Sequence, residues 1–481
     1  MMSLCARDPG GVPLQTAKVA RAAFPNGCLG MRIRDALGPV FRDKDFADLF
    51  PRRGRPAWSP GQLAMVMVLQ YVEGLSDRQA AVAVRDRIGW KYAMGLELSD
   101  PGFDFSVLSE FRDRLVEGSA ERRVPTRVLE ACRTAGLLGS GGPARTDSTH
   151  MLAAVRTLNR LELVGETMRA ALNALAVAAP RWLAAEWADR YGHRVENYRL
   201  PQQAAERAAY VQTVGADGAW LLAAVEADRA VEWLAQVEAV QILRVVWQQQ
   251  FAREADGLRW REVTELPPSR DRIASPYDIE CRYAIKRTMR WTGYKTHLTE
   301  HCGPDRPHVI VNVATTDAAH SDQQMVQRIH NQLDQQDLLP DEHFVDTGYM
   351  AARVVLAEAD HHGVELVGPM PPDTSWQAAA KQGFDGAAFA IDWQAHTATC
   401  PQGVVATQWR EQRDSQGREV IWIRFPDKAC LQCPVRRQCT HGRANPVTWS
   451  SHRGQNTTCS NGRAANRAPT RGRSVTACGP G

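Results

Sequence analysis

Two short stretches decide the fold, RTDSTH at Arg145–His150 and HFVDTGY at His343–Tyr349. Each has the pattern of a buried strand that delivers an aspartate and then ends. In the second stretch, Phe344 and Val345 suit a strand interior, and the Thr-Gly pair after the aspartate ends the strand. Two aspartates at strand ends could share divalent cations, because hard carboxylate oxygens suit Mg²⁺ or Mn²⁺. The pattern therefore predicts metal-assisted phosphoryl chemistry.

Together with the segment Trp291–Lys295 (WTGYK), these stretches resemble DDE transposases of bacterial insertion sequences. The resemblance extends from about Phe41 to about Arg443. It implies an α/β fold, a ribonuclease H-like mixed sheet with a large helical insertion, preceded by an all-α N-terminal domain. It also implies that Asp147 on the first strand and Asp346 on the fourth are the catalytic metal ligands. A glutamate on a later helix completes the site in that family.

The chain is expected to contain several domains, because 481 residues exceed one ordinary core. Strands that alternate with helices in the second half indicate a mixed sheet covered by helices. The expected order is a flexible arm, a helical DNA-binding domain, a catalytic domain with its helical insertion, a cysteine-rich unit and a disordered tail. These parts are predicted at residues 1–40, 41–122, 123–390 (insertion 151–270), 391–442 and 443–481.

The N-terminal domain has the signals of a helix-turn-helix. Ser59 and the proline after it start a helix. Ser76–Gln79 has the pattern of a capping box that opens a second helix after a glycine turn, and a third helix begins at Ser106. Such a unit predicts DNA binding, with Arg78 and Arg85 as contacts. A helical bundle that mediates oligomerisation is the alternative that periodicity leaves open.

A basic run with interleaved aromatic residues, Trp291 and Tyr294, leads into the second strand of the expected sheet. Such a surface suits phosphate contacts and base stacking, and a solvated strand face is the alternative. Its candidate DNA contacts are Arg282, Lys286, Arg287 and Lys295. The net charge of +4 does not establish nucleic-acid binding by itself. His150 could also contact DNA or a metal-bound water, although a lone histidine is more often structural.

Four cysteines form a candidate zinc site: Cys400, Cys430, Cys433 and Cys439. The second and third have the two-residue spacing of a zinc knuckle, and a closed site of four thiolates would be structural. His441 could replace the first cysteine, and four unrelated reduced thiols are the alternative. Arg436 and Arg437 would lie on the knuckle, where they could touch DNA.

The third carboxylate of the family is missing, because no glutamate follows Glu419 and no aspartate follows Asp427. The residues from His441 onward include six arginines but no Leu, Ile, Met, Phe or Tyr, so they cannot form an amphipathic helix on a sheet. Out-of-frame reading of GC-rich DNA produces such a composition, and the chain is expected to be a frameshifted, truncated transposase. Glu358 and Glu365 are poor substitutes for the missing acid.

The expected function is transposition of an insertion sequence by metal-dependent DNA cleavage and strand transfer, in a protein made defective by the missing acid. The expected cofactors are Mg²⁺ or Mn²⁺ and a structural Zn²⁺. The expected partners are double-stranded DNA, as terminal inverted repeats and target, and further copies of the chain in a homodimer or larger assembly. Neither a membrane span nor a secretory signal is visible, so a cytoplasmic, nucleoid-associated location is expected. The alternatives are a non-catalytic DNA-binding remnant, a metal-dependent nuclease, and a zinc-dependent regulator whose two aspartates are structural.

Overall fold

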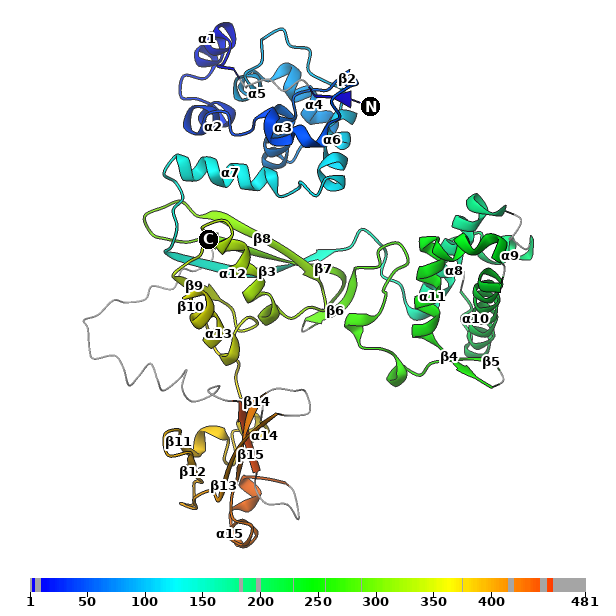
Figure 1. Cartoon of the computed structure of the whole chain (residues 1–481), viewed down its shortest axis with the longest axis vertical. Coiled ribbons are helices and arrows are strands. Elements are labelled where there is room, and N and C mark those ends of the chain that lie inside the picture. Colours follow the sequence, from blue (N-terminus) through cyan, green and yellow to red (C-terminus); the bar gives the residue numbers. More distant parts are fainter. Residues whose placement is uncertain are drawn as a thin grey trace. The chain divides into compact units, whose positions relative to one another are not determined.

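The computed structural model divides the chain into two units, whose elements are labelled in Figure 1. Unit 1 comprises Met1–Gly141 and His301–Val311, and unit 2 comprises Gly142–Glu300 and Asn312–Gly481. No described helix has the length and apolar character needed to cross a membrane. The structure describes residues 2–4, 10–180, 185–195, 200–227, 229–255, 257–286, 288–373, 375–413, 419–441 and 448–452.

Unit 1 is mainly helical, and its largest buried cluster includes Leu69, Leu108 and Phe111. Two short strands, β1 and β2, pair in parallel beside the helices. The elements are β1 (Met2–Ser3), α1 (Leu14–Ala23), α2 (Leu29–Leu37), η1 (Asp43–Leu49), β2 (Arg55–Pro56), α3 (Pro60–Glu73), α4 (Asp77–Asp86), α5 (Ile88–Met94), α6 (Ser106–Glu117) and α7 (Arg123–Thr134).

The predicted helix starts in unit 1 are present. The Ser59 side chain accepts a hydrogen bond from the backbone N–H of Gln62 at the start of α3. Ser76 and Gln79 form the predicted capping box at the start of α4, with the Ser76 N–H donating to Oε1 of Gln79 at 2.9 Å. Helix α4 ends at Asp86, because Arg87 takes an extended conformation that separates α4 from α5.

Ser76→Ala is expected to lower the free energy of unfolding of unit 1 by about 1 kcal/mol, because it removes the side-chain acceptor of the cap. Urea denaturation followed by circular dichroism measures the change. Ser99→Ala is the control, since Ser99 is exposed in a turn and no hydrogen bond of its hydroxyl is described. Equal stabilities of the two variants would show that the cap contributes nothing.

The prediction of a flexible arm before residue 41 is wrong for the described part of that segment. Helices α1 and α2 both pack against α5. Ala20, Met31 and Tyr92 form a buried cluster between these helices. The Thr16 hydroxyl donates to a backbone carbonyl in the loop after α5 at 2.8 Å. The apolar residues of these short helices are covered by α5, which lies far along the chain.

The first part of unit 2 after β3 is a helical insertion with its own buried core. Its chain ends in a β-hairpin, in which Phe251 pairs with Trp260. The elements are α8 (Arg160–Ala178), α9 (Ala185–Tyr191), α10 (Ala204–Ala227), η4 (Arg229–Gln236), α11 (Glu238–Gln250), β4 (Phe251–Glu254), β5 (Gly257–Trp260), η5 (Val263–Glu265) and η6 (Ser269–Asp271).

A six-stranded mixed sheet forms the centre of unit 2, with the strand order β10-β9-β3-β7-β6 and β8 paired with β7. Strands β10, β9 and β3 are parallel to one another, and β6 is antiparallel to β7. This confirms the expected mixture of helices and a mixed sheet. The elements are β3 (Pro143–Leu152), β6 (Arg282–Lys286), β7 (Met289–His301), β8 (Val309–Asp317), η7 (Asp322–Gln324), α12 (Val326–Asp334), β9 (Glu342–Val345), α13 (Ala352–His362) and β10 (Glu365–Val367).

The cysteine-rich region contains a hairpin and a three-stranded antiparallel sheet around Phe389, Ile423 and Phe425. Its last strand, β15, pairs with β14 and extends the sheet. This strand lies in the segment 443–481, so the prediction of a disordered tail is wrong for these residues. Residues 453–481 lie outside the described residues. The elements are α14 (Trp376–Ala380), η8 (Gly386–Ala388), β11 (Ala390–Asp392), β12 (Thr397–Thr399), β13 (Gln408–Arg413), β14 (Glu419–Arg424), α15 (Asp427–Gln432), η9 (Arg436–Gln438) and β15 (Thr448–His452).

Candidate active site

The two predicted aspartates lie side by side on neighbouring strands. Strands β3 and β9 are parallel, and the last pair of their register is Thr146 with Val345. Asp147 is the next residue on β3, and Asp346 immediately follows the end of β9. The prediction that the first strand ends at its aspartate is wrong, because β3 continues to Leu152. Because side chains alternate along a strand, the buried threonine and valine face the interior while both aspartates face the exposed side. Neighbouring strands are about 4.8 Å apart, so the two carboxylates share one edge of the exposed face.

Each aspartate also shapes the backbone that follows it. Asp346 Oδ1 accepts a hydrogen bond from the Gly348 N–H at 2.9 Å, and Asp147 Oδ1 accepts one from the Ser148 N–H at 2.7 Å. Within the described residues, neither Oδ2 atom makes a hydrogen bond. One oxygen of each carboxylate is thus held in place and the other remains available for a ligand.

A third carboxylate, Asp322, lies beside Asp346, and sequence reasoning missed it as a site residue. A Cβ atom placed on Gly348 would lie 2.9 Å from Asp322 Oδ2 and 3.1 Å from Asp346 Oδ1. These two oxygens are therefore no more than about 6 Å apart, the sum of the two distances. Asp322 lies at the start of η7, five residues after the end of β8, so no strand-end pattern marked it. Gly348 leaves the space in which the two carboxylates approach each other.

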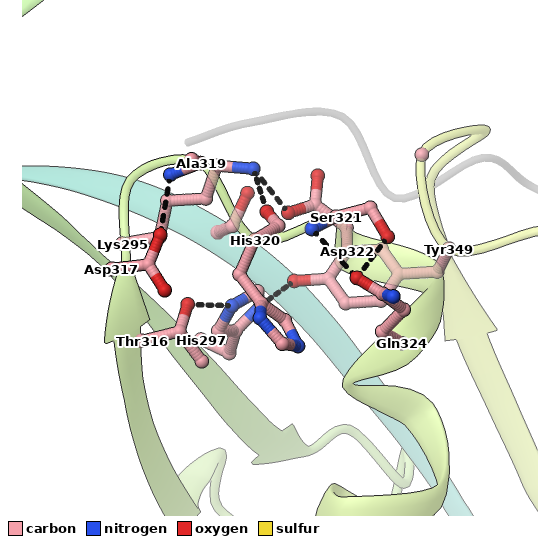
Figure 2. A network of polar contacts seen from close by, with 12 residues as sticks. Lys295, His297, Thr316, Asp317, Ala319, His320, Ser321, Asp322, Gln324 and Tyr349 are labelled. Atoms are coloured by element: carbon pink, nitrogen blue, oxygen red, sulfur yellow. Dashed lines mark hydrogen bonds and ion pairs between the residues drawn. The ribbon is translucent and has the colours of Figure 1, made fainter. Parts of the chain in front are cut away.

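Asp322 pairs with Lys295, as Figure 2 shows. The Lys295 ammonium donates to Asp322 Oδ1 at 3.0 Å and to the backbone carbonyl of His320 at 2.7 Å. The side chains of the pair are only 15% and 11% exposed. Lys295 was predicted to contact DNA, but the structure uses its charge to neutralise a partly buried carboxylate.

Tyr349 and His297 support the loop that carries Asp346 (Figure 2). The Tyr349 hydroxyl lies 2.6 Å from Nδ1 of His297, and both side chains are fully buried. Burial raises the pKa of Tyr349, and the negative charge of Asp322 raises it further. Burial also lowers the pKa of His297. Both rings therefore stay neutral near pH 7, and the hydrogen bond between them holds the loop after β9 in place.

The other predicted DNA contacts have mixed surroundings. The guanidinium of Arg78 lies over the ring of Phe105, 4.0 Å from its centroid, and Arg85 Nε donates to a backbone carbonyl at 2.9 Å. Arg282 donates to backbone carbonyls before β6, whereas Lys286 is exposed. Arg287 lies outside the described residues. Exposed surface thus remains on β6, while several of the arginines also hold the fold together.

His150 lies away from the paired aspartates. It is three residues after Asp147 on β3, so strand alternation places it on the opposite face. There its ring makes an edge contact with Trp291, with 4.2 Å between the ring centroids. This arrangement favours a packing role.

The two glutamates considered as substitutes lie elsewhere. Glu358 is buried on α13 and its carboxylate is within hydrogen-bonding distance of His330 and His362. Glu365 pairs in register with Glu342, at the opposite end of β9 from Asp346. Neither therefore faces the paired aspartates.

The four predicted zinc ligands line one small cavity of about 30 Å³ with Phe384, Phe389 and Phe425. Burial raises the pKa of the Cys439 thiol, and the three other thiols raise it further. His441 instead packs against Trp376, with 4.0 Å between the ring centroids. Arg436 lines the same cavity and Arg437 is exposed. However, no three of these sulfur atoms lie within 4.8 Å of one another among the described residues, so the set would have to tighten around a zinc ion.

Paired exposed carboxylates, one within β3 and one directly after the end of the parallel strand β9, define a candidate site for metal-assisted phosphoryl transfer. Residues 23–114, which span α2 to α6 of unit 1, match a family model described as a transposase domain (DUF772). This match supports a transposase family and a transposase function, for which DNA is the general partner. Comparisons with curated proteins and with solved structures gave no match.

Proposed function

We propose that this chain is a DDE-type DNA transposase in which Asp147 and Asp346 hold Mg²⁺ or Mn²⁺ for DNA cleavage and strand transfer. The observation that carries the proposal is the register of β3 and β9, which ends on the pair immediately before the two aspartates. The transposase-domain match in unit 1 supports the same function independently. The strand order is also consistent with a ribonuclease H-like sheet. Without the edge strand β6, the strands of this sheet are, in chain order, β3, β7, β8, β9 and β10. Asp147 therefore belongs to the first strand and Asp346 follows the fourth.

The donor set fits hard divalent cations, because it consists of exposed carboxylate oxygens. Bound there, such ions would stabilise charge on the attacking and leaving oxygens of a phosphodiester. The residues around the pair orient it: the turn at Gly348 holds Asp346, and the buried Tyr349 holds the turn. Lys295 keeps Asp322 neutralised beside them.

The proposed present-day protein is impaired in cleavage. Residues 428–481 contain no aspartate or glutamate, so they do not supply the expected third acid. Asp322 places its Oδ2 beside Asp346, yet the ion pair of its Oδ1 with Lys295 offsets the charge that would attract a metal. A frameshift near the start of the tail is the proposed origin of this loss, and a reading frame that encodes a glutamate-bearing amphipathic helix would support it.

Unit 1 is proposed to bind the terminal repeats of the element, and further copies of the chain to assemble on that DNA. The exposed Arg78 and Arg87 both line a shallow pocket on α4 and supply positive charge to this surface, although Arg87 also pairs with Glu73. A structural zinc ion held by the four cysteines is proposed for the cysteine-rich region.

Cleavage of labelled DNA that flanks the gene, with and without Mg²⁺, tests the proposal. Binding to this DNA in preference to unrelated DNA is expected, with slow cleavage that disappears in Asp147→Ala and Asp346→Ala. Asp360→Asn is the control, because Asp360 is an exposed carboxylate on α13. Cleavage that persists in both alanine variants would refute the catalytic assignment.

A second candidate function is a DNA-binding remnant without catalysis, which the missing acid favours. Specific binding with no cleavage at any Mg²⁺ concentration would support it. Cleavage without preference for the flanking DNA would instead indicate a metal-dependent nuclease. A protein that neither binds nor cleaves this DNA would contradict all three.

A further inference from the structure

Three potential metal ligands converge between helices α12 and α13, on side chains that the proposed function does not use. His330 Nδ1 lies 2.6 Å from Glu358 Oε2, and His362 Nδ1 lies 2.8 Å from the same oxygen. The three side chains are 0%, 2% and 11% exposed in the order His330, Glu358, His362. In the ranges that the structure describes, this is the sole set of three or more His, Cys, Asp or Glu ligand atoms that all lie within 4.8 Å of one another.

The three ligands lie on two neighbouring helices, α12 and α13. Glu358 and His362 are four residues apart on α13, so they lie on one face of the helix. His330 reaches the same point from α12, which packs against α13. Because the ligands come from two helices, an ion bound among them would tie the helices together.

The far nitrogen of each imidazole has a partner, as is usual for histidines that bind metals. His362 Nε2 lies 3.0 Å from the side-chain amide oxygen Oδ1 of Asn331, and His330 Nε2 lies 2.7 Å from Nδ1 of His343. The Asn331 oxygen can only accept, so His362 Nε2 must carry a proton. A neutral His362 then has an unprotonated Nδ1, and this lone pair is directed at the carboxylate of Glu358.

Two acceptors this close require a proton or a metal cation between them. No lysine or arginine pairs with Glu358 within the described residues, and its carboxylate is buried. A buried carboxylate without a countercharge is costly. Either a shared proton or a bound cation can occupy this position, and the convergence of three ligand atoms suits a cation.

We propose that His330 Nδ1, His362 Nδ1 and a Glu358 oxygen bind one divalent transition-metal ion of the zinc class. Two imidazole nitrogens and one carboxylate oxygen are a common ligand set for Zn²⁺, and a water molecule would complete a tetrahedron. The ion would replace the proton shared by His362 Nδ1 and Glu358, so one ion enters and one proton leaves. The role of the ion is structural, since the ligands are buried and the set lies apart from the paired aspartates.

The site is connected to β3 through hydrogen bonds. His343, the partner of His330, has its Nε2 2.6 Å from Oγ1 of Thr146, which in turn lies 2.7 Å from Oγ1 of Thr299. An ion on His330 Nδ1 would fix the proton on its Nε2 and thereby the direction of this chain of hydrogen bonds. Thr146 immediately precedes Asp147, so the ion would stiffen the strand that carries the first catalytic aspartate.

Zinc content separates this site from the cysteine site. The full chain, without an affinity tag that binds metal, is loaded with Zn²⁺, dialysed and analysed by mass spectrometry of the metal. His362→Ala is expected to hold one zinc ion fewer per chain than the unmodified protein. His361→Ala is the matched control, because the neighbouring His361 is exposed and takes no part in the cluster. The cysteines are unchanged in both variants, so their contribution cancels.

The melting temperature in the presence of Zn²⁺ and the zinc content of a second ligand variant test the same site. Zn²⁺ should raise the melting temperature of His361→Ala more than that of His362→Ala, because the ion binds the folded state. Glu358→Gln, which keeps the shape of the side chain, should lose the same zinc ion if His362→Ala does not fold. Equal zinc contents in the unmodified protein, the control and a folded ligand variant would overturn the proposal and show a hydrogen-bonded cluster only. Cleavage by Asp147 and Asp346 is a separate readout and does not decide this outcome.

Discussion

Asp346→Asn is expected to weaken Mn²⁺ binding at the end of the sheet at least about tenfold, or ~1.4 kcal/mol. The substitution removes one negative charge from the pair formed with Asp147, and charge count is a main determinant of affinity for hard cations. The asparagine side-chain oxygen can still accept the hydrogen bond from the Gly348 N–H that Asp346 accepts at 2.9 Å. The turn should therefore survive, and the variant separates the metal-binding role from the structural one.

Titration calorimetry with Mn²⁺ measures the change on protein that has been loaded with zinc and dialysed, so that zinc stays only on the tighter nitrogen and sulfur ligands. Asp385→Asn is a matched control. Asp385 also accepts backbone hydrogen bonds in a turn, from Ala387 and Ala388, but it lies in the cysteine-rich region. If Asp346→Asn and Asp385→Asn bind Mn²⁺ equally well, Asp346 is a turn residue and the metal assignment fails.

The strand end before Asp346 could be predicted because it depends on local signals, whereas β3 does not end at Asp147 as predicted. In HFVDTGY, alternate residues of the strand are buried, and the structure buries His343 and Val345 while it exposes Phe344 and Asp346. The capping box at Ser76 and the helix from Ser106 depend equally on neighbours in sequence. Local hydrogen bonds and side-chain periodicity are sufficient to specify such features.

Asp322 and Lys295 could not be assigned in the same way. Each lies in a segment with its own plausible local explanation, a helix start for Asp322 and a basic strand for Lys295. Their ion pair exists because the end of β8 returns beside β7, and this return is a property of the whole sheet. The same holds for His330 and His362, which have ordinary helical positions until α12 and α13 pack together.

Gly293, in the WTGYK segment, explains part of that segment's pattern. Its φ of +155° is a backbone conformation that residues with a side chain rarely adopt. A Cβ atom at this position would lie 2.1 Å from the carbonyl oxygen of Met151 and 2.7 Å from the backbone N of Ala153. Both contacts are with backbone atoms, which cannot rotate away as a side chain can. The glycine therefore permits the end of β3 to approach β7 closely.

Gly293→Ala is expected to lower the free energy of unfolding of unit 2 by about 4 kcal/mol, from roughly 2 kcal/mol of backbone strain and roughly 2 kcal/mol of overpacking. Gly257→Ala isolates the first contribution, because Gly257 has a φ of +133° and no atom within 4 Å of an added Cβ. Urea denaturation compares the two variants, and hydrogen exchange of the β7 amides locates the loss. The Asp147 strand should loosen with β7, so Gly293→Ala should also weaken Mn²⁺ binding. A stability within about 0.5 kcal/mol of Gly257→Ala would show that the backbone moves apart at little cost and that close approach of β3 to β7 is not required.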